Sequence, residues 1–183
     1  MRNKENIINE IIERQGFENY LEIGYDEGLN FDRIKCREKY SVDPVGHAHF
    51  QGTSDDFFSV NKEVFDIIFI DGLHISDQVQ RDIINSMAFL SEDGAIVIHD
   101  TIPKTKEMQE VPRNTKEWTG NVWRAVIGFH KQHSDVKLLT YKSDYGLTVI
   151  YPNGNKFVDL FEDKETTWEY FDKNKKELLK IVD

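Results

Sequence analysis

Residues 65–70 are the segment that most limits what this chain can fold into. They read Phe-Asp-Ile-Ile-Phe-Ile, are apolar on both faces after Asp66, and stop at Asp71-Gly72. A strand that is apolar on both faces is typical of the centre of a parallel sheet, where helices cover both sides. Parallel strands need crossover connections, so the rest of the chain is expected to supply those helices.

Apolar periodicity predicts such elements on either side of this segment. The alternation of strands and helices indicates an α/β, Rossmann-like fold with a seven-stranded, mostly parallel sheet, helices on both faces and a C-terminal antiparallel hairpin. The predicted strands are 20–24, 39–43, 48–53, 65–70, 94–98, 136–141 and 147–151. The predicted helices are 4–15, a short helix capped by Ser54, 76–90, and one that Asn121 caps and that ends near 133.

The length of 183 residues fits a single domain, 1–183. Within it we expect an N-terminal helix over 1–16 and a C-terminal helical tail over 153–183. Residues 101–120 show no periodicity and predict a substrate loop or lid. The tail carries Trp168, Phe171, Leu178 and Val182 on one predicted helical stripe, which would pack on the body or on a second copy of the chain in a homodimer.

Composition excludes several classes of function. The net charge of −10 disfavours binding to nucleic acid and to anionic membrane surfaces. The longest apolar stretch, 67–70, is far shorter than the ~20 residues of a membrane span. The only cysteine is Cys36, so no disulfide can form within the chain, and we expect a cytoplasmic protein.

Polar residues gather where the predicted parallel strands end. Ligands of open α/β sheets bind beyond the carboxyl ends of the strands, and four of these five ends carry a carboxylate. The candidates are Glu22 to Gly28, Asp43, Thr53 to Asp56, Asp71 to His74, and His99 to Thr101.

The first of these turns reads Glu22-Ile-Gly-Tyr-Asp-Glu-Gly28. Its glycine spacing differs from the dinucleotide fingerprint G-x-G-x-x-G, and its acidic residues would repel a pyrophosphate but attract a cationic ligand. Asp43 follows about twenty residues later, where an acid accepts the two ribose hydroxyls in nucleotide-binding sheets. An alternative for Asp43 is a turn cap beside Pro44.

Taken together, the motifs resemble those of the class I S-adenosylmethionine-dependent methyltransferases. They are E-I-G-x-x-x-G, V-D-P, I-D-G-L-H and G-x-I-V-I-H-D-T-x-P, within residues 20–150. More narrowly, they resemble a small bacterial O-methyltransferase branch related to the macrocin and catechol-type O-methyltransferases. One departure is Asp26, which stands where the first motif often has a further glycine.

The resemblance implies a role for each matched residue with S-adenosyl-L-methionine as cofactor. Glu22 and Gly24 would border its methionine part, and Gly24 and Gly28 would shape the loop. Asp43 would hold the ribose. The residues beside the adenine would be Thr53, Ser54 and Asp55, and Asp71 would also contact the cofactor.

Asp71, His74, His99 and Asp100 form the predicted chemical cluster. In catechol-type relatives, a carboxylate after the fourth strand and an acid–amide pair after the fifth bind magnesium. Asp71 matches the carboxylate after the fourth strand, whereas His99-Asp100 stands in place of the acid–amide pair. Since magnesium prefers oxygen ligands, the histidine is a departure from this magnesium site. The sequence leaves two possibilities open. Either a metal ion (Mg, Mn or Zn) binds to Asp71, His99 and Asp100, or no metal binds. Without a metal, His74 or His99 would be the general base beside Asp71.

The segment Trp118-Thr-Gly-Asn-Val-Trp123 resembles a W-x-G-x-V-W motif of related bacterial proteins. We expect Trp118 and Trp123 to form part of the substrate wall, since indole faces bind sugars and aromatic rings. Arg113 is a candidate for an anionic group of the substrate. The alternatives are that both tryptophans belong to the core and that Arg113 is simply solvated.

The leading functional hypothesis is therefore an O-methyltransferase that acts on a hydroxyl of a small molecule or sugar, in polysaccharide or secondary-metabolite biosynthesis. A metal-dependent hydrolase built on the Asp71, His74, His99 and Asp100 cluster is the main alternative, but it leaves the acidic first turn without a role. An NAD-type oxidoreductase lacks its glycine fingerprint here, and a binding module without chemistry is the fourth hypothesis.

Overall fold

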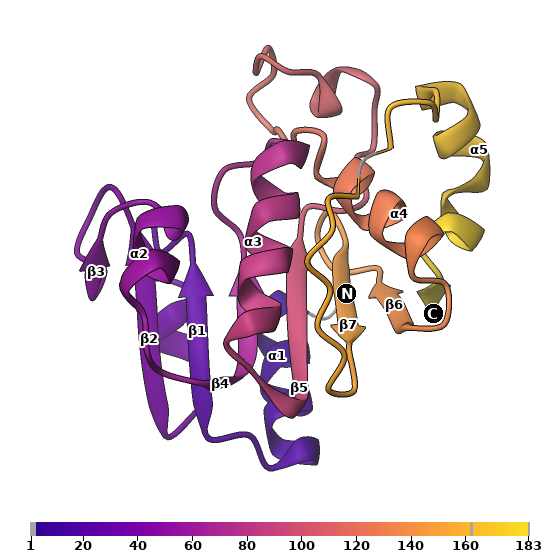
Figure 1. The fold of residues 1–183 in the computed structure, drawn as a ribbon. Helices are drawn as coiled ribbons and strands as arrows, with labels where there is room; N and C mark the ends of the chain where they lie inside the picture. Colours follow the sequence, from indigo (N-terminus) through magenta and orange to yellow (C-terminus); the bar gives the residue numbers. More distant parts are fainter. Residues whose placement is uncertain (1–2, 162, 183) are drawn as a thin grey trace.

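The computed structural model describes residues 3–161 and 163–182. Among these, eight strands form one sheet in the order β3-β2-β1-β4-β5-β7-β6-β8 (Figure 1). They are β1 (Asn19–Ile23), β2 (Glu38–Asp43), β3 (Phe50–Gln51), β4 (Phe65–Ile70), β5 (Leu90–His99), β6 (Lys137–Tyr141), β7 (Leu147–Tyr151) and β8 (Ile181–Val182). The first five are mutually parallel, and β7 runs antiparallel between β5 and β6. The predicted α/β sheet with a C-terminal hairpin is confirmed.

Helices cover both faces of the sheet. The helices are α1 (Lys4–Gln15), α2 (Ser54–Val60), α3 (Ser76–Ala88), α4 (Val122–Gln132) and α5 (Trp168–Leu178), with short 3-10 turns at Phe31–Arg33 and Glu107–Gln109. The isoleucines of α1 pack on one face with Ile67 and Phe69, and α2, α3 and α4 pack on the other face with Ile68 and Ile70. The central strand β4 is thus apolar on both sides because it is covered on both sides.

Three details differ from the sequence-based predictions. The side chain of Thr53, and not that of Ser54, caps α2 by accepting from the amide of Asp56. Asn121 precedes α4 but caps α3 instead, because its Oδ1 accepts from the amide of Ser76 at 2.6 Å. Val182 lies in the additional strand β8, beside β6, and so does not share a helical stripe with Trp168.

The C-terminal segment packs against the body of the same chain. Phe171 of α5 is fully buried, and its ring stacks on the indole of Trp123 in α4 with centroids 4.0 Å apart. Lys131 of α4 binds the carboxylate of Asp163 at 3.1 Å and thereby fixes the segment that leads to α5. The tail therefore belongs to the hydrophobic core.

No helix in the part of the chain that the structure describes combines the length and apolar character needed to cross a membrane.

The tail contact gives a stability prediction. Phe171→Ala should lower the free energy of unfolding by about 3–5 kcal/mol, because it removes a fully buried ring and leaves a cavity beside Trp123. The neighbouring Tyr170→Ala, at a side chain 57% exposed, should change it by about 0.5 kcal/mol or less. Urea unfolding followed by circular dichroism measures both. A loss under about 1 kcal/mol for Phe171→Ala would mean that the tail does not pack this way in solution.

Candidate active site

A cavity of about 850 Å³ opens at the carboxyl ends of β1, β2, β4 and β5. It lies where the strand order reverses between β1 and β4, the usual ligand site of an open parallel sheet. Its volume is in the range of small-molecule and cofactor sites. The predicted site residues that line it are Glu22, Gly24, Asp43, Thr53, Ser54, Asp71, His74, His99, Asp100 and Trp118.

Gly24 lets the turn after β1 approach the end of β4. Its φ is +94°, and a Cβ there would lie 2.1 Å from the carbonyl oxygen of Asp71. Any other residue would clash with backbone, so a side chain at this position would push the two strand ends apart. Gly28, with φ +76°, lies against the ring of Tyr25 and lets the same loop close, although it does not line the cavity.

The carboxylate of Asp43 is held in place at the end of β2. Its Oδ2 accepts from the amide of Asp26 at 3.0 Å and its Oδ1 from the amide of Val45 at 2.8 Å. Each oxygen keeps a lone pair for a ligand in the cavity. The turn-cap interpretation is correct, and it leaves the ribose prediction open, because Asp43 also lines the cavity.

Glu22 is buried within β1, with 1% of its surface exposed. Its Oε2 accepts from the hydroxyl of Tyr20 and from Nδ2 of Asn30 at 2.8 Å. Burial raises the pKa of Glu22 to about 7, although these two hydrogen bonds act in the opposite direction. Its charge therefore depends on what enters the cavity.

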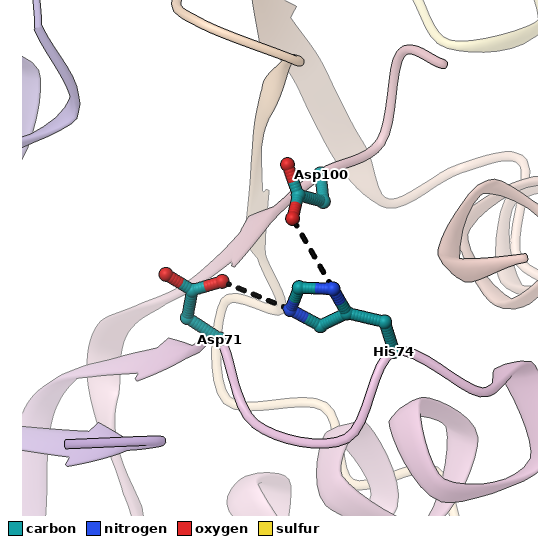
Figure 2. A group of neighbouring side chains, drawn as sticks. All are labelled: Asp71, His74 and Asp100. Atoms are coloured by element: carbon teal, nitrogen blue, oxygen red, sulfur yellow. Dashed lines mark hydrogen bonds and ion pairs between the residues drawn. The ribbon is translucent and has the colours of Figure 1, made fainter. Parts of the chain in front are cut away.

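Figure 2 shows the centre of the chemical cluster, where the imidazole of His74 lies between two carboxylates. His74 Nε2 is 3.3 Å from Asp71 Oδ1, and its Nδ1 is 3.3 Å from Asp100 Oδ2. Asp71 directly follows β4 and Asp100 directly follows β5. Asp100 has the unusual φ of 60°, a strained conformation of the kind that collects at functional sites.

Two further cationic groups surround Asp71. His99 Nδ1 lies 3.1 Å from Asp71 Oδ1, and the ammonium of Lys4, from the first turn of α1, lies 2.6 Å from Asp71 Oδ2. Burial alone would raise the pKa of Asp71, but the charge of His99 and the hydrogen bonds from His74 and His99 hold it well below its usual range. Burial opposes the charged imidazoles, yet the carboxylates of Asp71 and Asp100 raise the pKa of both histidines.

The donor set does not fit magnesium. Ligand atoms of Asp71, His74 and Asp100 lie within 4.8 Å of one another, a spacing that a metal ion could bridge. However, magnesium prefers an octahedron of oxygens, and both oxygens of Asp71 already have nitrogen partners, the ammonium of Lys4 on Oδ2 and the rings of His74 and His99 on Oδ1. The ring nitrogens of His74 face carboxylates and donate to them when the ring is protonated.

The irregular segment over 101–120 forms one wall beside His74. The indole of Trp118 stacks on the His74 ring with centroids 5.6 Å apart. Gly120 makes this approach possible, because a Cβ there would lie 1.7 Å from the carbonyl oxygen of His74. The segment also meets the β6–β7 turn, where the hydroxyl of Tyr145 donates to Glu117 at 2.6 Å.

Besides Gly28, three predicted site residues do not line the cavity. Trp123 is fully buried against Phe171, so the core interpretation of this tryptophan is correct. Arg113 is exposed and donates to carbonyls of its own loop, including that of Thr115 at 3.0 Å. Asp55 points away on α2 and pairs with Arg81 at 3.2 Å.

Sequence reasoning missed several residues that line the cavity, among them Lys4, Asp82 and Tyr145. Lys4 and Tyr145 gave no signal, because they reach the site from a helix and a turn far away in the chain. Asp82 does have a sequence signal, because it is an acidic residue beside Ile83 on the buried face of the predicted helix over 76–90.

A family model described as a methyltransferase domain matches residues 30–101, which include Asp43, Asp71, His74, His99 and Asp100. The match spans less than half of the chain, so it shows a similarity to methyltransferase domains, which agrees with the predicted resemblance to class I methyltransferases. A search of curated proteins found no match.

Solved structures with the same fold include several methyltransferases. An O-methyltransferase from Bacillus cereus in complex with S-adenosylhomocysteine is 12% identical, with 81% of this chain and 80% of that chain covered and a TM-score of 0.54. A methyltransferase from Podospora anserina bound to S-adenosylhomocysteine is 16% identical, with 82% and 79% covered and a TM-score of 0.57. The O-methyltransferase TomG from Streptomyces achromogenes, involved in tomaymycin synthesis and in complex with S-adenosylmethionine, is 11% identical, with 81% and 78% covered and a TM-score of 0.55.

The buried acid in β1 gives a pH prediction for the ligand-free protein. The pKa of Glu22 is about 7 in the fold against 4.5 for the free group, so wild type should lose up to roughly 3 kcal/mol of stability as pH rises from 4.5 to 7. Glu22→Gln cannot ionise and should gain stability relative to wild type between pH 5 and pH 8. Urea unfolding at both pH values measures this difference, with the exposed Glu18→Gln as control. If the difference in free energy of unfolding between Glu22→Gln and wild type stays constant with pH, the raised pKa of Glu22 is refuted.

Proposed function

We propose that this protein is a methyltransferase that transfers the methyl group of S-adenosylmethionine to a hydroxyl group of a small molecule. The observation that carries the proposal is the continuity of one cavity. It joins the Gly24 turn and the Asp43 carboxylate, which suit the cofactor, to the Asp71–His74–Asp100 cluster, which suits proton removal. The methyltransferase match over residues 30–101 supports the same activity.

The alternatives leave part of this cavity without a role. A hydrolase would use the cluster but would have no function for the acidic turn and Asp43. An NAD-type oxidoreductase would need a loop that accepts pyrophosphate, and Glu22, Asp26 and Glu27 all line the cavity there. A binding module would have no need for an imidazole held between two carboxylates.

The residues around the cavity fit the cofactor by charge and by shape. S-adenosylmethionine carries a sulfonium and an ammonium group, and the cavity is lined by acidic residues, Glu22 of β1 and Asp26 and Glu27 of the turn after it. Asp43 would hold the ribose hydroxyls with the lone pairs that its turn leaves free. When bound, the cofactor supplies a methyl group on a good leaving group, so the chain must align the acceptor oxygen and remove its proton.

We assign proton removal to His74. Its side chain is 20% exposed, compared with 9% for His99, so it is the more accessible base. In the neutral form one ring nitrogen keeps its hydrogen toward a carboxylate, and the other takes the proton of the acceptor hydroxyl. The resulting imidazolium can donate to both Asp71 and Asp100, whose negative charges stabilise it. His99 positions Asp71 from the opposite side.

This mechanism needs no divalent metal. Lys4 supplies the positive charge beside Asp71 that a metal would otherwise supply, and the rings of His74 and His99 lie against its other oxygen. A metal at Asp71 would have to displace or neutralise these groups against their mutual attraction.

The acceptor would lie against Trp118, which stacks on His74 and lines the cavity. A flat apolar wall next to a base suits a sugar ring or an aromatic ring that carries a hydroxyl. A sugar of a polysaccharide or secondary-metabolite pathway is our first choice. A cytoplasmic location and a homodimer stay predictions from the sequence.

Titration with S-adenosylhomocysteine tests the cofactor site. We expect micromolar binding by calorimetry that is unchanged by EDTA, since Lys4 takes the place of a metal. Asp43→Ala should weaken binding at least about tenfold, because it removes charge-assisted hydrogen bonds. The exposed Asp135→Ala should bind like wild type. Absence of binding by wild type would refute the proposed function, and loss of binding with EDTA would refute the metal-free site.

Kinetics of a histidine variant test the base. His74→Ala should lower the turnover number about 100-fold or more while it leaves the affinity for S-adenosylhomocysteine within about threefold of wild type. The measurement is transfer of an isotopically labelled methyl group to a panel of catechols and monosaccharides. His130→Ala, on α4 outside the cavity, is the matched control. Unchanged turnover in His74→Ala with an acceptor that wild type methylates would show that another group removes the proton.

A further inference from the structure

Asp82 is a buried carboxylate in the cavity wall that the proposed mechanism does not use. It lies on α3, 1% exposed, and lines the same cavity as Asp43 and Ser54. Its Oδ2 has no hydrogen-bond partner among the residues that the structure describes. A buried acceptor without a partner is destabilising, so such an atom on a residue of the cavity wall points to a ligand that donates to it.

The other carboxylate oxygen is fully engaged and fixes the orientation of the group. Asp82 Oδ1 accepts from the hydroxyl of Ser54 at 2.5 Å and from Nε2 of Gln78 at 3.0 Å. The same Gln78 amide also donates to the Ser54 hydroxyl oxygen at 3.1 Å. This triangle uses both hydrogens of the amide and the one hydrogen of the hydroxyl, which leaves Oδ2 as the free acceptor.

The place of Asp82 in the cavity indicates which part of a ligand it meets. Asp43 ends β2, Ser54 begins α2 just after the neighbouring strand β3, and the hydroxyl of Ser54 donates to Asp82 on α3; all three residues line the cavity. A base attached to a ribose at Asp43 would extend along this wall. The wall also contains Leu73, an apolar side chain 53% exposed that could cover the face of a ring.

We propose that Asp82 Oδ2 accepts a hydrogen bond from the exocyclic amino group of adenine and so selects adenine over bases that carry an oxygen there. The inference rests on the proposed function, because it takes the ligand to be an adenosyl compound. Burial raises the pKa of Asp82 to about 6, with the hydrogen bonds from Ser54 and Gln78 opposing the rise, so above that pH the carboxylate is the dominant form. A carboxylate oxygen attracts an amino donor and repels a carbonyl oxygen.

The experiment compares two ligands that differ at this group and at the adjacent N1, which carries a hydrogen only in the inosyl compound. S-adenosylhomocysteine carries the amino group, and S-inosylhomocysteine carries a carbonyl oxygen in its place. Calorimetric titration at pH 7.5 should show that wild type binds the adenosyl compound at least about tenfold more tightly, as expected for a buried acceptor that loses its donor. This comparison needs no variant.

Asp82→Asn sharpens the test, because the Ser54–Gln78 triangle should hold the amide oxygen at the position of Oδ1. The amide nitrogen then takes the place of Oδ2 and offers a donor in place of an acceptor. We expect the preference to fall about tenfold or more, or to reverse toward S-inosylhomocysteine. Asp77→Asn, an exposed acid on the same helix and outside the cavity lining, should keep the wild-type preference.

The possible results separate this inference from the proposed function. If wild type binds both compounds equally, or if Asp82→Asn keeps the wild-type preference, then Asp82 does not select the base, although the methyltransferase proposal stands. If wild type binds neither compound, the proposed function fails and this inference fails with it. Preference for adenine in wild type that is lost in Asp82→Asn and kept in Asp77→Asn would support the assignment.

Discussion

The carboxylate of Asp71 is the interaction on which the site depends, since it ties together four parts of the chain. It follows β4, binds Lys4 of α1, contacts His74 of the next loop, and contacts His99 at the end of β5. Its own backbone carbonyl sets the space that Gly24 must leave open. A buried carboxylate is costly unless charged partners surround it, so loss of any one partner would weaken the positions of the others. This shared dependence explains why an N-terminal helix takes part in a site built on strand ends.

The parallel pairing of β1 with β4 converts sequence motifs into this arrangement. Ile23 is paired with Ile70, which places the Gly24 turn directly beside Asp71. The pairing of Ile70 with Ile98 brings His99 and Asp100 to the same edge. A shift of one residue in either register would turn the side chains after the strands toward opposite faces. The apolar strand β4 pairs with a strand on each side and packs against helices on both faces. It therefore fixes the geometry of the candidate site as well as the core.

Much of the fold could be predicted from the sequence because its signals are local. The strand at 65–70 and the hairpin strand at 147–151 were predicted to the residue, since apolar runs and turn residues mark their ends. Caps were less certain, because Thr53 and Ser54 can both cap a helix and only the tertiary structure selects Thr53. The roles of Trp118 and Trp123 could not be separated by motif, because the face of α4 that is buried depends on α5, which is far away in sequence. The contact of Lys4 with Asp71 joins residues 67 positions apart, and no pattern in the sequence predicts it.

The acids around the cavity divide into two kinds, and the division matches two kinds of task. The pKa of Asp71 lies well below its usual range because cationic groups of the chain surround it, so its charge is fixed and can stabilise an imidazolium. Burial raises the pKa of Glu22 to about 7 and that of Asp82 to about 6, and neither has an ion pair with a lysine or arginine among the described residues. Burial opposes the charged form of both groups, and a donor or a positive charge in the cavity would favour that form. One site can thus hold permanently charged carboxylates for chemistry and conditionally charged ones for ligand binding. By this argument the carboxylate of Asp71 has its partners within the chain itself, whereas Asp82 Oδ2 finds one only when the cavity is filled.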